Sequence, residues 1–369
     1  MGSLWMGPAP IGIINAFAEI EQMLNNARAI IIFLIINNSS NFNCQMCEYL
    51  LLMKPRFSQN IIAIVWDFDK TLIPYYMQKP MFKEYGVDEK QFWDEVIQLP
   101  KLYEKQGIKL SPDTAYLNHI LTYVRKGIFK NLSNKKLREL GSQLEMFPGL
   151  PDFFQVCQEL VLANDLFRRF EIKVEHYIVS TGLTEIIRGS TINRFVNGIW
   201  GCEFIESAYE PISGSLSLID GGGCINDIAY QIDNTTKTRA LFEINKGVNV
   251  HPDDISVNQA MPEQDRRVPF KNMIYIADGP SDVPAFSVVK KNQGKTFAVY
   301  NKSNPLSFKQ AQQLHKDGRV DACFEADYTE SSTAYLWLTN EIIHIAEQIA
   351  LEKKSSLRQG KDSVPTHIN

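Results

Sequence analysis

Two aspartates directly after a short apolar run are the first residues in this sequence whose spacing indicates chemistry. The run Ile61–Trp66 leads into Asp67 and Asp69, with Thr71 close behind. A run of this length suits a buried strand, and carboxylates at the end of a parallel strand lie where α/β folds bind ligands. Two of them repel each other unless a cation separates them or one holds a proton. The pattern indicates a hard-cation site or a nucleophile with a general acid, although an Asp-rich turn would use the same residues.

Hydroxyl groups and a lysine follow farther along the chain. Ser180, Thr181 and Gly182 come after a second apolar run. They can cradle a phosphate with N–H and O–H groups, and they are also ordinary loop residues. We expect Lys237 in the first turn of a helix capped by one of the two threonines before it. A cation there opposes the helix dipole, so the position favours anion binding unless Lys237 is simply a solvated surface residue.

A second pair of aspartates follows a third apolar run. The strand predicted at Met273–Ala277 ends in Asp278, and Gly279 allows a tight turn. A helix that begins near Ser281 would hold Asp282 in its first turn, facing Asp278. Such a pair suits a cation with oxygen ligands, and it is equally typical of a capped helix after a strand.

The four segments together resemble the haloacid dehalogenase-like (HAD) hydrolase superfamily, and most closely its phosphoserine phosphatase-like branch. The signature of that family is DxDxT, then a Ser or Thr at a strand end, then a Lys, then DGxxD after a strand. This chain has these groups in the same order, and the resemblance spans roughly residues 61–324: they are Asp67–Thr71, Ser180–Gly182, Lys237 and Asp278–Asp282.

The resemblance implies an α/β fold, a Rossmann-like parallel sheet with helices on both faces, and an inserted all-helical cap. Amphipathic segments between the first two motifs agree with such a cap. We therefore predict an α/β core at 56–76 and 146–352 with the cap at 77–145. A terminal helix is expected to end near residue 352, followed by a disordered tail at 353–369.

The resemblance also implies a Mg²⁺-dependent phosphomonoester hydrolase that works through an aspartyl-phosphate. Asp67 would be the nucleophile, Asp69 the general acid and base, and Lys237 a second cation. The phosphate would be held by Ser180, Thr181, Gly182 and Lys237. The metal would be held by Asp67, Asp69, Asp278 and Asp282, although Asp282 could instead act through water or steady Lys237.

The substrate is less defined by the residues. Phosphoserine phosphatases place a Glu about nine residues after the first Asp to read the substrate amino group. That position is Tyr76 here, and Tyr75, Met77 and Phe82 suggest a roomier, apolar entrance. We expect a small phosphorylated metabolite as substrate. A phosphotransferase and a phosphate-site binding protein without turnover remain alternatives.

Composition limits the other function classes. The 369 residues are 44% apolar with a net charge of −4, which gives no sign of nucleic-acid binding. The cysteines form no disulfide framework, so a cytoplasmic location is expected. Residues 1–55 read as an N-terminal extension, helical or disordered, whose apolar stretch 29–36 is too short to span a bilayer. We therefore expect no firm membrane association. Met53 would be a natural start for the fold. The sequence does not define the oligomeric state or the role of the polar insert 249–270.

Overall fold

The central strand of the sheet, β1 (Ile61–Trp66), is buried along its whole length. A strand buried on both faces must be covered by helices on both faces, which is typical of parallel sheets. The structure is a computed structural model that describes residues 56–206, 209–212, 215–218 and 223–362. The predicted extension 1–55 lies outside the described residues.

Seven strands form the sheet in the order β6-β3-β2-β1-β7-β8-β9. All neighbouring pairs are parallel except β3 with β6. The chain adds β2 and β3 on one side of β1, and β7, β8 and β9 on the other, so the strand order reverses at β1. Ligands bind at such a reversal, outside the carboxyl ends of the strands. The other strands of the sheet are β2 (Lys173–Leu183), β3 (Val196–Ile205), β6 (Asp227–Tyr230), β7 (Met273–Ala277), β8 (Lys295–Tyr300) and β9 (Ala322–Glu325).

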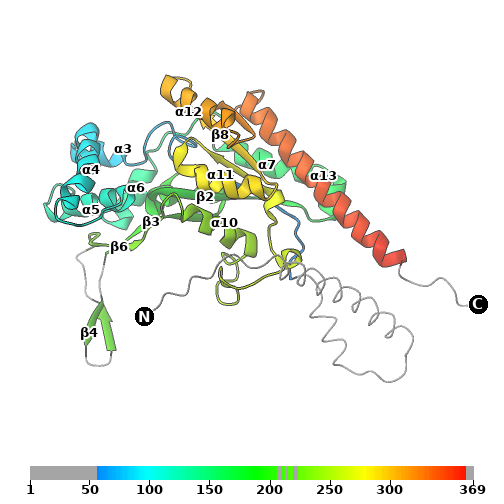
Figure 1. Cartoon of the computed structure of the whole chain (residues 1–369), viewed down its shortest axis with the longest axis horizontal. Helices are drawn as coiled ribbons and strands as arrows, with labels where there is room; N and C mark the ends of the chain where they lie inside the picture. The colour runs from blue at the N-terminus through cyan, green and yellow to red at the C-terminus, as the bar shows by residue number, and fades with distance from the viewer. Residues whose placement is uncertain (1–55, 207–208, 213–214, 219–222, 363–369) are drawn as a thin grey trace, which may run out of the picture. The chain divides into compact units, whose positions relative to one another are not determined.

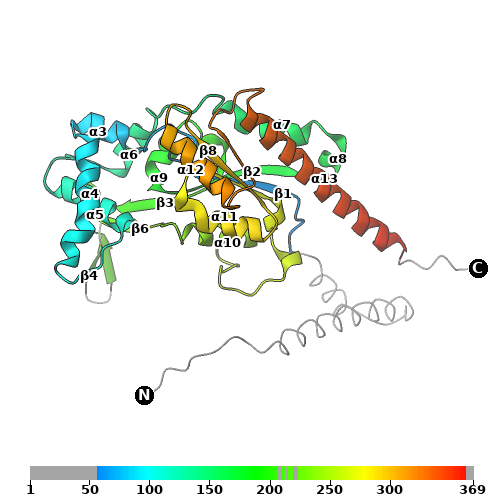
Figure 2. The same cartoon turned by 45° about the horizontal axis from the view of Figure 1, so that its top comes forward.

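Helices cover both faces of the sheet (Figures 1 and 2). On one face α7 packs on β2 and α13 on β1, while α10 packs on β2 and α11 on β7 and β8 on the other. The predicted fold class, an α/β sheet with helices on both faces, is confirmed. The helices are α7 (Asp152–Leu162), α8 (Asp165–Arg169), α9 (Thr184–Gly189), α10 (Lys237–Lys246), α11 (Val283–Lys291), α12 (Pro305–Lys316) and α13 (Thr333–Asp362).

In the predicted cap segment, residues 77–145, the structure contains four helices and turns without a named strand. The four helices lie together at one end of the sheet (Figure 1). They surround a cluster of aromatic rings in which Phe92 contacts Phe82, Tyr123 and Phe129. We refer to these helices as the cap: α3 (Lys79–Tyr85), α4 (Glu89–Glu104), α5 (Pro112–Arg125) and α6 (Asn134–Gly141).

The last helix is longer than predicted. Disorder was expected from residue 353, but α13 continues to Asp362. Because Glu352–Gln359 contains no Gly or Pro and several good helix formers, its polar composition does not end the helix. Among the described residues, no helix is both long and apolar enough to cross a bilayer.

Two further segments lie apart from the strand ends that carry the motifs. A separate hairpin pairs β4 (Tyr209–Ile212) with β5 (Ser215–Leu218). The insert 249–270 is fastened to the start of β2 by an ion pair of 2.6 Å between Arg267 and Glu175. Ser180 lies near the other end of β2, so this part of the insert is remote from the motif residues.

Candidate active site

The two strands on either side of the reversal bring the first and last motifs together. Asp67 follows β1, and its N–H donates to the carbonyl of Ile276 on β7 at 2.8 Å. Asp278 follows β7 directly. Carboxylate oxygens of Asp67, Asp278 and Asp282 all lie within 4.8 Å of one another. The sequence expectation that these strand ends converge therefore agrees with the geometry.

Lys237 joins two of these carboxylates. Its Nζ lies 2.8 Å from Oδ1 of Asp67 and 2.6 Å from Oδ1 of Asp282. The side chain is only 1% exposed, so Lys237 is not a solvated surface lysine. The two carboxylates balance the charge of the buried ammonium, whereas an isolated buried lysine would have no compensating charge.

The start of α10 explains why Lys237 points inward. Asp233 Oδ1 accepts the N–H groups of Thr235 and Thr236 at 2.8 and 2.7 Å. Thr236 is the N-cap residue, as predicted, but the predicted capping is wrong in its chemistry, because the Thr236 hydroxyl accepts the N–H of Asp233 and no N–H of the helix. The carboxylate two to three residues upstream is a stronger acceptor for these N–H groups. The side chains of Ala240, Leu241 and Ile244 are buried and pack the helix against the core.

Asp282 is held by several donors. It ends the short 3-10 turn Pro280–Asp282 and is fully buried. Besides Lys237, the hydroxyl of Tyr275 donates to Oδ1 at 2.6 Å and that of Ser281 to Oδ2 at 2.8 Å. Because both carboxylate oxygens have protein donors, this geometry favours the alternative in which Asp282 steadies Lys237.

The second motif lies in an irregular part of β2. The sequence predicted Ser180–Gly182 in a loop after the strand, whereas β2 continues to Leu183. Val179 pairs with Trp200 and Leu183 with Cys202, so three residues of β2 face a single residue of β3 and bulge from the ladder. This bulge releases Ser180–Gly182 from regular pairing.

Two contacts shape this bulge. The N–H of Gly182 donates to Ser180 Oγ at 3.0 Å, so the serine hydroxyl keeps its proton for another acceptor. A Cβ at Gly182 would lie 2.1 Å from Cε of Met77, so a larger residue there would displace the Met77 side chain. The glycine thus allows the close approach of Met77 to the strand end.

Asp69 faces the same space without joining the three clustered carboxylates. Its Oδ1 accepts the N–H of Met77 at 2.9 Å. A cavity of about 250 Å³, which we call the reaction pocket, is lined by Asp67, Asp69, Lys70, Tyr76, Ser180, Thr181, Asp278, Gly279, Pro280, Ser281 and Gln310.

Burial and like charges set the protonation of these carboxyls. Burial raises the pKa of Asp67 to about 6, against the opposing effect of Lys237. Burial, with the charges of Asp67 and Asp282, raises the pKa of Asp278 to about 7. Burial and Asp67 also raise the pKa of Asp69 well above its usual range. Burial alone would lower the pKa of Lys237, but Asp282 and Asp67 outweigh it and raise the pKa, so the ammonium stays charged.

The carboxylates fit a hard divalent cation. Asp67 and Asp278 face each other, and among the described residues no ion pair engages Asp278. Carboxylate oxygens are the ligands that Mg²⁺ prefers, and a cation between them would relieve the repulsion that raises their pKa values. Asp67 and Asp278 are therefore the residues best placed to hold one.

The sequence reasoning did not identify several residues of this region. Lys70 adopts a left-handed backbone with φ of 60°, and its Nζ lies 3.8 Å from the ring centre of Tyr76. The lysine stands inside the first motif and could have been noticed there. Tyr275 and Ser281, which donate to Asp282, gave no such signal because tyrosine in a strand and serine in a turn are common.

The chain has a close relative of known sequence. It is 38% identical over 292 residues to an uncharacterized protein of Borreliella burgdorferi, covering 77% of this chain and 97% of the relative. This chain belongs to the family of that Borreliella protein. No family model matches this chain.

Solved structures with a similar fold have lower sequence identity to this chain than the Borreliella protein. A probable phosphoserine phosphatase from Vibrio cholerae is 13% identical, with a TM-score of 0.43 and coverage of 84% of this chain and 76% of that one. A HAD family hydrolase from Salmonella enterica serovar Typhi is 16% identical, with a TM-score of 0.41 and coverage of 73% and 75%. At this level of overlap the likeness adds no support for a function, which depends on the residues at the strand ends.

Proposed function

We propose that this chain is a Mg²⁺-dependent phosphomonoester hydrolase of the HAD type, acting on a small phosphorylated metabolite through an aspartyl-phosphate. The observation that carries the proposal is Lys237, a buried ammonium held between Asp67 and Asp282 beside the carboxylate of Asp278. A surface helix capped for stability would not bury a lysine in its first turn, where the cation opposes the helix dipole. Such an arrangement suits the binding of a phosphoryl group.

Asp67 is the nucleophile in this proposal. One carboxylate oxygen attacks phosphorus in line, forming an O–P bond while the bond from phosphorus to the leaving oxygen breaks. Lys237, 2.8 Å from Asp67, orients the carboxylate. Ser180 donates its hydroxyl proton to a phosphoryl oxygen, because its oxygen already accepts the N–H of Gly182. Thr181 and Gly182 complete the phosphate-binding segment.

Asp69 transfers the protons. Burial and the charge of Asp67 raise its pKa well above the usual range, which favours the protonated form that can give a proton to the leaving oxygen. The resulting carboxylate then removes a proton from the water that attacks phosphorus. That attack breaks the bond to Asp67, releases inorganic phosphate and restores both carboxyl groups.

A divalent cation would complete the charge balance. Bound by Asp67 and Asp278, with Asp69 and Asp282 beside them, Mg²⁺ would neutralise the phosphate so that an anionic nucleophile can approach it. The free thiols among the described residues, at Cys157, Cys202, Cys224 and Cys323, support the cytoplasmic location that we propose with this function.

The test is hydrolysis of p-nitrophenyl phosphate by the full chain with Mg²⁺ or with EDTA. We expect metal-dependent release of phosphate, and we expect Asp67→Asn to lower kcat by at least about a thousandfold while thermal unfolding stays cooperative. Asp253→Asn, an exposed carboxylate of the insert, is the matched control and should keep full activity.

The same assay separates the alternatives. Transfer of the phosphoryl group to added glycerol in preference to water would identify a phosphotransferase. Retention of turnover by Asp67→Asn, or no turnover by the wild-type chain with any of a panel of phosphorylated metabolites, would reject the hydrolase.

A further inference from the structure

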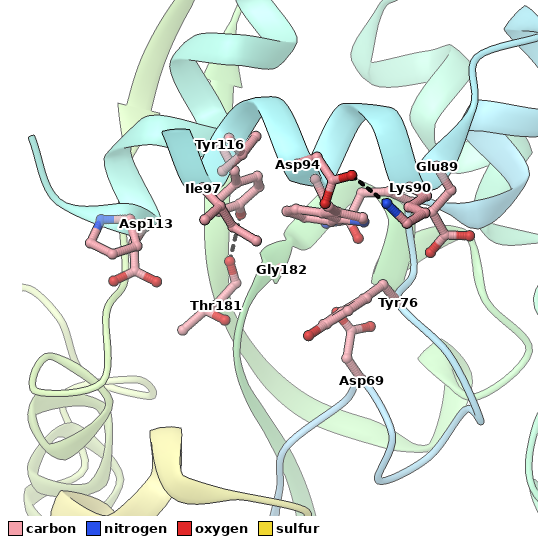
Figure 3. Close-up of a pocket in the computed structure, with 14 residues that line it drawn as sticks. Asp69, Tyr76, Glu89, Lys90, Asp94, Ile97, Asp113, Tyr116, Thr181 and Gly182 are labelled. Atoms are coloured by element: carbon pink, nitrogen blue, oxygen red, sulfur yellow. Dashed lines mark hydrogen bonds and ion pairs between the residues drawn. The ribbon is translucent and has the colours of Figure 1, made fainter. Parts of the chain in front are cut away.

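A second and larger cavity adjoins the reaction pocket on the side of the cap. It encloses about 740 Å³ and shares Asp69, Tyr76 and Thr181 with the reaction pocket. Figure 3 shows Asp69 and Tyr76 below α4, which carries Glu89, Lys90 and Asp94 on the opposite side. With the phosphoryl group at Asp67, the leaving group of a substrate would extend into this space, which we call the leaving-group cavity.

Aromatic rings form much of the wall. Tyr76 and Trp93 lie with ring centres 5.2 Å apart, and Trp93 and Tyr116 lie 6.1 Å apart. All three residues line the cavity, one from the loop after β1 and two from the cap. The hydroxyl of Tyr116 donates to the carbonyl of Thr181 at 2.5 Å, which fixes this ring against the strand end. Aromatic faces attract cations, and quaternary ammonium groups most clearly.

The charged residues of the cavity are predominantly acidic. Lys90 is the one cation among the described lining residues, and it forms an ion pair of 2.5 Å with Asp94. Glu89 and Asp113 line the cavity without an ion pair among the described residues. The nearest other cation, Lys70, lies on the ring of Tyr76 and lines the reaction pocket. The charges around Trp93 and Tyr116 therefore favour a positive group.

A buried acceptor provides an independent sign of a missing partner. Gln78 lines the cavity with only 2% of its surface exposed, and its Oε1 has no hydrogen-bond partner in the part of the chain that the structure describes. Buried polar atoms in native proteins are nearly always paired. Reorientation of this amide toward a bound hydroxyl or ammonium N–H would supply the pair.

We infer that the substrate is the phosphate ester of an amino alcohol whose ammonium group lies against Trp93 and Tyr116, on the side of Asp113. This inference rests on the proposed function, because it assigns the leaving group of that reaction. An amino acid ester such as phosphoserine fits less well: its carboxylate would need a cation, and the one lysine of the described lining is paired with Asp94.

The experiment compares substrates that share the phosphate and differ in the rest. Phosphocholine and phosphoethanolamine carry a cation, glycerol 3-phosphate is neutral beyond the phosphate, and phosphoserine adds a carboxylate. We expect kcat/KM for the best cationic ester to exceed that for glycerol 3-phosphate and phosphoserine by at least about tenfold, mainly through KM, given ordinary cation–π strengths. Tetramethylammonium should inhibit turnover of the cationic esters competitively.

Variants of α4 and α5 test which residues cause the preference for cationic esters. Trp93→Leu and Asp113→Asn should each raise KM for the cationic ester about tenfold, with a much smaller change in KM for the neutral glycerol 3-phosphate. Tyr103→Leu and Glu104→Gln lie at the end of α4 outside the cavity, and these matched controls should leave KM unchanged. Thermal unfolding of each variant checks that the cap still folds.

The outcomes distinguish a failure of this inference from a failure of the proposed function. Hydrolysis of p-nitrophenyl phosphate with no preference for the cationic esters overturns this inference and leaves the proposed function intact. Equal KM shifts for neutral and cationic esters in the two cavity variants also overturn it, because a purely structural role would not discriminate charge. Absence of any metal-dependent hydrolysis overturns the proposed function as well.

Discussion

The four acidic residues of the site differ in the ion pairs and hydrogen bonds that their carboxylates form. Asp67 and Asp282 share Lys237, whereas Asp278 makes no ion pair among the described residues. Asp69 stands apart and receives an N–H from Met77. Identical side chains are thus suited to distinct tasks by the charges around them, which is typical of active sites. The unpaired carboxylate of Asp278 is the one that most requires a cation.

Asp278→Asn therefore tests the charge balance of the site. The pKa of Asp278 is raised to about 7, above its ordinary value of 3.8. When the pKa of a carboxyl is higher in the folded chain than in the unfolded chain, the protein loses stability as the pH rises from the unfolded to the folded value. In EDTA at about pH 8, we expect the variant to be more stable than wild type by ~2 kcal/mol, with the difference vanishing below about pH 4.

Urea unfolding at several pH values measures this difference. Asp253→Asn is again the control, since that carboxylate is exposed, and it should follow the wild-type curve. Added Mg²⁺ should stabilise wild type more than Asp278→Asn, because ligand binding to the folded state adds to its stability. A variant that is less stable than wild type in EDTA at high pH would contradict this account.

At the scale of elements, β2 combines a regular buried strand with an irregular end. Its middle section carries His176, fully buried beside Trp66. The indole N–H of Trp66 lies 3.2 Å from Nδ1 of His176, and Nε2 lies 3.3 Å from the carbonyl of Phe154. These contacts select a neutral imidazole that accepts at Nδ1 and donates at Nε2. The strand thus contains a group that resists protonation.

His176 should make the protein sensitive to acid. Burial lowers its pKa to about 3, from 6.5. The unfolded chain then binds more protons between these values, so stability is present above about pH 6.5 and is lost as the pH falls toward 3. In His176→Gln, we expect the dependence of the unfolding free energy on pH between about 6 and 4.5 to become shallower by ~1 kcal/mol per pH unit.

The exposed residue His315 supplies the comparison for this measurement. His315→Gln on α12 should leave the pH dependence unchanged. Chemical denaturation in a series of buffers gives both slopes. Equal slopes for His176→Gln and wild type would show that the buried imidazole does not titrate on unfolding.

The whole molecule joins its cap to its core through a close helix crossing. An added Cβ at Gly141 on α6 would lie 2.0 Å from the carbonyl oxygen of Ile186 on α9. The crossing thus depends on glycine, and it holds α6 at the helix that follows the Ser180 segment. The described residues from Arg56 onward accordingly form one compact unit in which cap and core share the leaving-group cavity.

Gly141→Ala tests this junction. The methyl group must push α6 and α9 apart, so we expect a loss of ~1–3 kcal/mol in the free energy of unfolding. Gln143→Ala, two residues along and exposed, should change stability by less than about 0.5 kcal/mol. Urea denaturation measures both, and an unchanged midpoint for Gly141→Ala would show that the crossing adjusts without cost.

Much of this molecule could be predicted from local patterns. The apolar run 61–66 and the run 273–277 are strands with the expected bounds, because a short hydrophobic run between polar residues has few other stable solutions. The helical segment between the first two motifs followed from periodicity. Strand ends that carry carboxylates were expected to meet, because parallel strands present their carboxyl ends at one edge.

Contacts between distant segments were decided by the tertiary structure alone. The start of α10 is a local exception: the threonines before Lys237 looked like caps, but the nearby carboxylate of Asp233 accepts the N–H groups. The bulge at Ser180–Gly182 arises from the register of β2 on β3, which no local pattern encodes. Tyr76 was visible in the sequence as a departure from phosphoserine phosphatases. Only the packing of the cap shows it beside Trp93, because side chains far apart in sequence meet only when long-range packing positions them.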